Sequence, residues 1–559
     1  MKRLMALTLC LVLCLTAMGS VAFAAEYDSA NVSLDGTLPI VKDPSKLEPM
    51  TIVIPTPENR VINENDLQWT KDVFAATGVP IKFIGVPESG YAEKVNLMLA
   101  SGDLPDMFWK GISASTITQY IGQDVFLPTD ELIEKYCPNL VEIFKKRPQY
   151  AALSQYADGH RYGFPYVEEM YGLTLTPGPF LINKTWLDKL GLEVPKTLDE
   201  FKAALVAFKN AGDLNGNGEA DEIPYACNFV TKDIFSTLNS FFTLMPCFGE
   251  GVSYGDEYPY CKLGKDGKVE FAVLSDAFKE CLHFYNELNQ EGLLDMDGFS
   301  GEGDYTYKLR LDDAVVGAFS IWSPEGSIPV HDVLEQYVPL PRLEGPKGKM
   351  GIAVNRSELW GTSQSVLTTA CKYPEIAAAL MNYLNQPEQA ITTNWGSIGW
   401  SYKKGEDGVL RFPLDDKGYF ILPEGMETFN DVRQNSTPAQ GGVTVLNDYY
   451  DTVAEYTYDA VNLLKFQRAN GKDEVLKEDT PLPPVLMTTE EQAAYSQIQP
   501  QIENIVKSYM VSSILDGGID ENYDTFVSDL KAAGLDEMIK LIQGAYDRYL
   551  VTYKEYAAK

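Results

Sequence analysis

Histidine is scarce in this chain, which has 559 residues and only three histidines, His160, His283 and His331. Because they lie far apart in the sequence, a metal centre built from several histidines is not expected. No C-x-x-C pair occurs, which argues against zinc knuckles and thioredoxin-like redox chemistry. The motifs H-E-x-x-H, G-x-S-x-G, G-x-x-x-x-G-K-S/T and G-x-G-x-x-G are absent too. The sequence therefore carries no signature of a zinc protease, an α/β-hydrolase, a P-loop nucleotidase or a dinucleotide-binding enzyme.

Basic residues are also in deficit, with 46 Lys and Arg against 79 Asp and Glu and a formal charge of −33. Nucleic acids and anionic lipid surfaces are bound by clustered Lys and Arg, so neither is expected as a partner. The acidic excess favours solubility in an aqueous compartment without naming a ligand. Apolar residues make up 45% and charged residues 22%, as in ordinary globular proteins, and the length suits several domains.

Long apolar runs are missing beyond the N-terminus, so no transmembrane helix is expected there. The N-terminus itself has a basic start, Lys2-Arg3, an apolar run at residues 4–17 and the small-x-small site Ala22-Phe23-Ala24. This pattern predicts a signal peptide over residues 1–24, with cleavage before Ala25. An uncleaved anchor is the alternative. We expect the protein to act outside the cytoplasm, in the extracellular space or at the cell surface.

Six cysteines follow the predicted signal peptide: Cys137, Cys227, Cys247, Cys261, Cys281 and Cys371. An even number in an exported chain permits disulfides. Cys247 and Cys261 flank a Gly- and Tyr-rich loop that a bond between them would close. Buried free thiols are the other possibility, and the sequence leaves both open.

Short apolar runs alternate with helical patterns from residue 50 onward. Strands are predicted at 50–54, 81–86 and 107–109, with helices at 65–77 and 91–100 between them. Strands that alternate with helices favour a parallel sheet with crossover helices. A second α/β stretch follows, with strands at 180–182 and 315–321. Its long amphipathic helix opens with a capping box formed by Thr197 and Glu200. Further helices are predicted at 275–290, at 374–385 and from 445 to the end.

An acidic loop over residues 213–222 is the sharpest motif in the chain. Oxygen-bearing side chains recur at every second position, with Gly218 placed for a sharp turn. This is the ligand spacing of an EF-hand calcium loop, except that position 12 is Pro224 instead of Glu. Hard oxygen ligands favour Ca²⁺ over transition metals, so we predict a structural calcium site. A turn that holds itself through Asx hydrogen bonds without an ion is the alternative. The predicted ligands are Asp213, Asn215, Asn217, Glu219, Asp221 and Glu222.

Aromatic residues are plentiful at 11% of the chain, and several Trp residues stand beside small or turn residues. These are Trp109, Trp322, Trp395 and Trp400. Aromatic faces pack against the C–H faces of sugar rings, while carboxylates and amides bind the hydroxyl groups. Core packing is the alternative for each Trp. Carboxylates are so abundant that a catalytic pair for glycoside hydrolysis is not excluded by counting, although no spacing singles one out.

Five segments together resemble the extracellular solute-binding proteins of ABC importers, in their large oligosaccharide- and alginate-binding branch common in Gram-positive bacteria. They are 97–106 (LMLASGDLPD), 158–165 (DGHRYGFP), 182–191 (INKTWLDKLG), the 213–224 loop, and 337–341 (YVPLP) with Gly345-Pro346. The resemblance implies an α/β fold with two lobes of the type II periplasmic-binding-protein kind. Each lobe has a central sheet flanked by helices, and the ligand cleft lies between them. The implied role is capture of an oligosaccharide and delivery to an ABC transporter permease, by a monomer that is not an enzyme.

The resemblance also implies roles for individual residues. Asp106 and Trp109 are similar to an acid and a Trp near the sugar in maltodextrin-type relatives, and Glu168 stands in the place of a hinge acid that contacts sugar hydroxyls. Trp322 resembles a sugar-contacting Trp after the returning strand. Trp395 and Trp400 lie in a Gly-rich turn that is expected to border the cleft. Alginate-binding relatives carry a structural calcium in a loop similar to 213–222.

The implied domain organisation has five parts. A signal peptide covers 1–24 and an N-terminal arm 25–48. Lobe 1 covers 49–165, with 317–365 returning to it, and lobe 2 covers 166–316. The remaining 366–559 are expected to be mainly helical, mostly in lobe 2 and at the cleft border. Many Gram-positive relatives are lipoproteins, but Cys10 and Cys14 here each follow Leu instead of a small residue, so the sequence does not favour a lipid anchor.

Three other functions remain open from the sequence alone. A two-lobed protein can bind a peptide or another solute, because fold does not fix function. It can also present its ligand to a membrane sensor. The third alternative is an exported glycan hydrolase that uses two of the many carboxylates.

Overall fold

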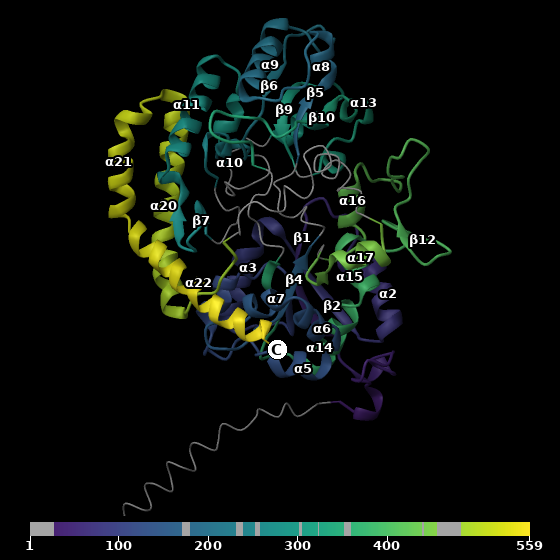
Figure 1. Cartoon of the computed structure of the whole chain (residues 1–559). Helices are drawn as coiled ribbons and strands as arrows, with labels where there is room; N and C mark the ends of the chain where they lie inside the picture. The colour runs from purple at the N-terminus through teal and green to yellow at the C-terminus, as the bar shows by residue number, and fades with distance from the viewer. Residues whose placement is uncertain are drawn as a thin grey trace, which may run out of the picture.

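Two β-sheets, each flanked by helices, divide the molecule into two lobes (Figure 1). The computed structural model describes residues 27–169, 179–230, 239–251, 258–300, 305–321, 323–351, 359–438, 441–455 and 482–558. The predicted signal peptide, residues 1–24, lies outside these ranges. None of the helices in these ranges is long and apolar enough to cross a membrane.

The first sheet has six strands in the order β14-β4-β11-β3-β1-β2. β11 is antiparallel to both β3 and β4, and the other pairs are parallel, so all strands except β11 run in one direction. The apolar run in β1 is fully buried, as expected for a strand covered on both faces. The strands are β1 (Met50–Thr56), β2 (Ile81–Pro87), β3 (Met107–Trp109), β4 (Phe164–Glu168), β11 (Leu359–Leu367) and β14 (Thr444–Val445). The helices of this lobe are α2 (Gln68–Thr77), α3 (Glu88–Ser101), α4 (Ala114–Tyr120), α5 (Asp130–Tyr136), α6 (Pro138–Lys146), α7 (Pro148–Leu153), α14 (Pro374–Leu384) and α15 (Pro387–Trp395).

The second sheet has four strands in the order β10-β5-β9-β6. β5 is antiparallel to both β9 and β10, and β6 is parallel to β9. The strands are β5 (Phe180–Asn183), β6 (Ile223–Tyr225), β9 (Val316–Ser320) and β10 (Tyr337–Pro339). The helices are α8 (Lys184–Lys189), α9 (Leu198–Ala211), α10 (Phe241–Leu244), α11 (Asp276–Gln290), α12 (Pro324–Ser327) and α13 (His331–Leu334), beside a hairpin of β7 (Cys261–Leu263) and β8 (Val269–Phe271).

Local sequence signals predict most of these elements. β3 has the predicted bounds, and β1 and β2 begin at the predicted residues. The capping box is present, because the Thr197 side chain accepts from the Glu200 backbone and the Glu200 side chain accepts from the Thr197 backbone. The parallel pairing of β1 with β2 and β3 agrees with the predicted alternation of strands and helices.

The observed lobe boundaries differ from the predicted ones. β9 and β10 pair with β5 in the second sheet, so the chain returns to the first lobe only at β11. The region after 366 is not mostly in lobe 2, since α14 packs on α5 and β14 adds to the first sheet. The same region also contains β12 (Lys403–Lys404), β13 (Leu410–Arg411), α16 (Phe429–Gln434) and α17 (Asn447–Thr452). Long-range strand pairing decides these boundaries, and local sequence does not encode it.

The N-terminal arm also packs on the first lobe. Val32, Ile40 and Val41 are buried in its core, and the Val41 backbone N–H donates to Thr77 O at 2.9 Å. These apolar residues make the segment part of the folded domain.

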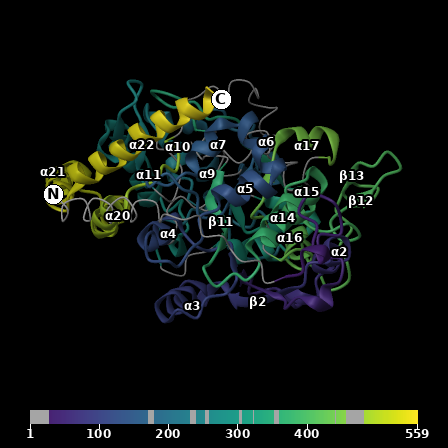
Figure 2. The same ribbon diagram turned by 90° about the horizontal axis from the view of Figure 1, so that it is seen from below.

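Three C-terminal helices run along both lobes (Figures 1 and 2). They are α20 (Thr489–Asp516), α21 (Ile519–Ala532) and α22 (Leu535–Ala557). α20 packs against α11 of the second lobe and α4 of the first, while α22 packs against α7 and β8. The Asn286 side chain donates to Ile514 O at 2.9 Å, and Thr489 Oγ1 donates to Thr118 O at 3.2 Å. This segment therefore connects the lobes along one side.

All six cysteines beyond the signal peptide are free and buried. Burial raises the pKa of each thiol, so none is an activated thiolate. Of the two possibilities left by the sequence, the structure has buried thiols, and Cys247 and Cys261 are not bonded to each other.

Candidate functional site

The carboxyl ends of β1, β2, β3 and β4 meet at one edge of the first sheet. The chain leaves this edge after β4 for the second sheet and comes back to it at the start of β11. The edge therefore faces the other lobe. Ligands of open α/β sheets bind beyond the carboxyl ends of the strands, which makes this edge the candidate site.

Lys110 is the first residue beyond β3 at this edge, and its backbone φ of 65° lies in the left-handed region. Two backbone bonds hold it there: its N–H donates to Gln364 O, and its carbonyl accepts from the Tyr91 hydroxyl. Its ammonium lies 5.8 Å from the ring centroid of Tyr166. Burial, followed by repulsion from Arg433, lowers its pKa to about 8. A lysine in strained backbone at the end of a strand is typical of a functional position.

Trp109 is the last residue of β3 at this edge, but its side chain turns into the core, whereas the sequence predicts that it contacts sugar. Its side chain is fully buried and packs edge-on against Trp69, with ring centroids 5.4 Å apart. Its indole N–H donates to Gly441 O at 3.1 Å. A Cβ at Gly442 would lie 2.1 Å from the indole nitrogen, so only glycine lets the backbone approach the ring this closely. Trp109 belongs to the core.

Asp106 is also structural, and its predicted ligand contact is not supported. It precedes β3 and therefore lies at the opposite edge of the sheet from Lys110. Its carboxylate accepts from Thr51 N at 2.8 Å, from Thr51 Oγ1 at 2.6 Å and from Lys372 N at 3.0 Å. These bonds join β1 to the turn before α14.

Glu168 ends β4 at the candidate edge, but its carboxylate points into a buried polar cluster. Oε2 accepts from Asn394 Nδ2 at 2.9 Å and Trp395 Nε1 at 3.2 Å, and Oε1 accepts from the Tyr450 hydroxyl at 2.8 Å. The residue is only 2% exposed, and burial raises its pKa to about 7. Its side chain orients Trp395 and Tyr450 instead of reaching open space.

The structure thus brings together two of the predicted site residues, Glu168 and Trp395. The Trp395 ring is buried, and the Arg433 guanidinium lies 4.1 Å from its centroid. Trp400 is half-buried in the turn after α15, packed on the core. Trp322 lies outside the described residues.

Sequence reasoning missed Lys110, whose place directly after a predicted strand was an available signal. It also missed Tyr450, Asn394 and Arg433, for which no local signal exists.

The acidic loop 213–222 has a network of internal hydrogen bonds. Asp213 accepts from the backbone of Gly216 at 2.6 Å and of Gly218 at 2.9 Å. The Asp221 carboxylate accepts from the side-chain amides of Asn215 at 3.1 Å and Asn217 at 3.2 Å. Within the described ranges, no group of three or more His, Cys, Asp or Glu side chains is arranged to hold a metal ion. The donor set itself, three carboxylates with two amide oxygens, fits the oxygen chemistry of Ca²⁺.

Comparisons with known proteins agree with this architecture. The model of the bacterial extracellular solute-binding protein family matches residues 62–222. The chain is 31% identical over 481 residues to the fructooligosaccharide ABC transporter substrate-binding protein FusA of Streptococcus pneumoniae, with 85% of each protein covered. The structure of S. pneumoniae FusA with kestose is 28% identical with a TM-score of 0.77, and the match covers 90% of this chain and 100% of that one. A FusA EF-hand mutant in complex with fructo-nystose matches with the same identity, TM-score and coverage. These likenesses confirm the two-lobed fold and the family resemblance predicted from the sequence.

Proposed function

This chain belongs to the family of bacterial extracellular solute-binding proteins, and we propose that it captures an oligosaccharide and delivers it to an ABC permease. The observation that carries the proposal is the similarity to a fructooligosaccharide-binding protein over 85% of both chains. The two lobes, with the strand ends of the first sheet facing the second, are suited to enclose such a ligand. No bond is broken in this role.

Capture proceeds by closure of the lobes on the ligand. A ligand shifts the equilibrium toward the closed state only if it makes contacts there that the open state lacks. We assign such contacts to Lys110, whose ammonium donates hydrogen bonds to sugar hydroxyls, and to Trp322, whose indole stacks on a sugar ring. Glu168 acts indirectly by holding the indole of Trp395 in its orientation. Trp400 is assigned to the border of the cleft.

The 213–222 loop is proposed to hold a structural calcium ion. Asp213, Asp221 and Glu222 would supply carboxylate oxygens, Asn215 and Asn217 amide oxygens, and Glu219 a backbone carbonyl. The ion would cross-link the start of the loop to its end beside β6. The similarity to a protein of which an EF-hand mutant has been made supports this proposal.

The remaining parts of the proposal concern location and partners. Residues 1–24 direct export, and the mature protein acts outside the cytoplasm. It works as a monomer with the permease subunits of an ABC transporter.

A thermal-shift screen of residues 25–559 in calcium tests the function. The panel contains fructo-, malto- and xylooligosaccharides, with short peptides as the contrast set. A ligand that binds only the native state raises the melting temperature, and the rise grows as the ligand concentration increases. A rise with one glycan class supports the proposal. A rise with peptides alone overturns it, and release of new reducing ends from a glycan identifies a hydrolase instead.

A further inference from the structure

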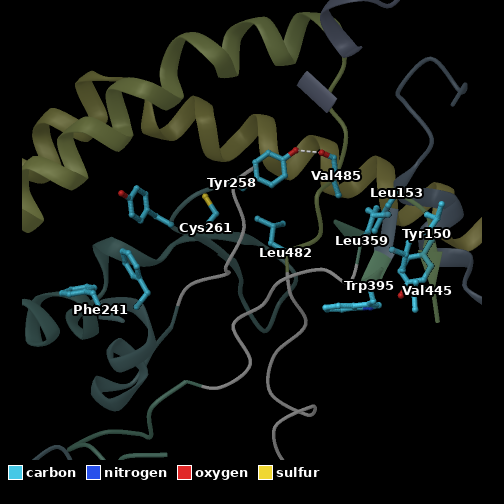
Figure 3. Close-up of a cluster of buried hydrophobic side chains, with 14 of the residues drawn as sticks. Tyr150, Leu153, Phe241, Tyr258, Cys261, Leu359, Trp395, Val445, Leu482 and Val485 are labelled. Carbon is cyan, nitrogen blue, oxygen red and sulfur yellow. Dashed lines mark hydrogen bonds between the residues drawn. The ribbon is translucent and has the colours of Figure 1, made fainter. Parts of the chain in front are cut away.

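A cavity of about 280 Å³ lies between the first lobe, the second lobe and α20. Gly361–Gln364 of β11 and the start of α4 form its first-lobe side, and Tyr258 forms its second-lobe side. Residues 484–487 and the first turns of α20 complete it. Tyr258 donates from its hydroxyl to Val485 O, and Figure 3 shows the two residues facing each other beside the C-terminal helices. Its volume is near the lower end of the range of ligand pockets, about 300–1,000 Å³.

The lining of this cavity combines apolar and polar side chains and carries no charge. None of the described lining residues is Asp, Glu, Lys, Arg or His, although charged residues make up 22% of the chain. Hydroxyl and amide side chains are present instead, among them Ser113, Thr362, Gln364, Gln492 and Ser496. Groups that donate and accept hydrogen bonds without net charge match a neutral polyhydroxylated ligand.

The cavity adjoins the candidate edge of the first sheet. The Lys110 backbone N–H donates to Gln364 O, and the Gln364 side chain lines the cavity. That side chain folds over Gly361, where an added Cβ would lie 2.0 Å from the Gln364 amide nitrogen. A ligand held beside Lys110 therefore extends naturally toward the cavity.

One face of α20 forms the outer wall. Gln492, Tyr495, Ser496 and Gln499 follow the spacing of three and four residues that places side chains on one side of a helix. Tyr495 is 3% exposed and packs edge-on against Tyr258, with ring centroids 5.7 Å apart. This contact between the C-terminal helix and the second lobe fixes the wall in place.

We propose that this cavity is a subsite for a terminal sugar unit of the ligand, and that α20 thereby sets the length of oligosaccharide the protein prefers. The inference rests on the proposed function. It assigns to the C-terminal helices a binding role in addition to their packing against both lobes.

The test compares two tryptophan variants of the full mature chain. Ser496→Trp places a large side chain in the cavity. Gln497→Trp is the control: it places the same side chain at the next residue of α20, which is exposed and lies about 100° further around the helix axis. Gln492→Leu removes an amide from the wall with little change in volume. Calorimetry measures the Kd for matched trisaccharides and tetrasaccharides: kestose and nystose, maltotriose and maltotetraose, xylotriose and xylotetraose. Melting curves confirm that each variant is folded.

For the pair that the wild type binds, we expect Ser496→Trp to raise the Kd of the tetrasaccharide at least about tenfold and that of the trisaccharide by less than about threefold. Gln492→Leu should act in the same direction, and Gln497→Trp should leave both values unchanged. Equal losses for the two sugars, or none, overturn the subsite while leaving oligosaccharide capture intact. If the wild type binds no glycan at all, the proposed function fails, and the subsite fails with it.

Discussion

The indole of Trp109 and the backbone carbonyl of Gly441 are joined by a hydrogen bond of 3.1 Å across 332 residues of sequence. This bond ties β3, in the middle of the first sheet, to the segment that enters β14 at the edge of the same sheet. Trp109, which the sequence predicts to contact sugar, is therefore a core residue. The adjacent Lys110 is the one that stands at the edge facing the second lobe.

Trp109→Ala should lower the free energy of unfolding by about 3–5 kcal/mol, because it removes a fully buried indole from a close-packed core. Trp109→Phe should lower it less, by about 1–3 kcal/mol, since Gly441 O then loses its buried donor. Urea unfolding measures both changes. Sugar affinity of the folded Trp109→Phe protein should match the wild type, and a selective loss of affinity at unchanged stability would restore Trp109 as a ligand contact.

Lys110→Met should weaken oligosaccharide binding by about 1.5–3 kcal/mol, the value of a hydrogen bond from a charged donor. The exposed Lys94→Met on α3 is the matched control and should bind as the wild type does. Because the pKa of Lys110 is lowered to about 8, wild-type affinity should fall as pH rises through this value and the ammonium loses its proton. Titration calorimetry at several pH values checks both expectations. An identical pH profile in Lys110→Met would contradict the assignment.

Glu168→Gln should change how stability depends on pH. The folded state raises the pKa of Glu168 from 4.5 to about 7, so it holds the proton over a range in which the unfolded chain has released it. The stability that Glu168 contributes to the wild type is therefore greatest at pH values below the pKa of this group in the unfolded chain. It is lost as pH rises to about 7, the pKa of the group in the folded state. At about 1.4 kcal/mol per unit of pKa, the loss is of the order of 3 kcal/mol.

Chemical unfolding of wild type and Glu168→Gln at several pH values measures this loss as the difference between their free energies of unfolding. Glu168→Gln should gain stability relative to wild type between about pH 5 and about pH 8, because Gln stays neutral throughout. Glu424→Gln, at an exposed loop position, is the control for a carboxylate outside the core. Parallel profiles for wild type and Glu168→Gln would show that the cluster does not favour the protonated acid.

Calcium should raise the melting temperature of the wild type, and a chelator should reverse the rise, because an ion bound only by the folded loop stabilises it by mass action. Asp213→Ala should abolish the response, since this carboxylate accepts from both Gly216 and Gly218 and occupies the first position of the loop. Asp266→Ala, in an exposed turn whose carboxylate accepts from Lys268 N, should respond as the wild type does. A wild type that is indifferent to the chelator would leave the loop as an Asx turn.

The sequence by itself determined the parts of this protein that depend on short-range pattern. β1, β3 and α9 form where apolar runs and the Thr197 capping box predict them, because strand and helix preferences act over a few residues. The family was recognisable from five short segments for the same reason. Only the tertiary structure decided which predicted site residues face the other lobe. Trp109, Asp106 and Glu168 are satisfied by Gly441, Lys372 and Tyr450, each hundreds of residues away. Because a buried polar or aromatic group takes its role from such partners, no local pattern distinguishes a core Trp from a ligand platform.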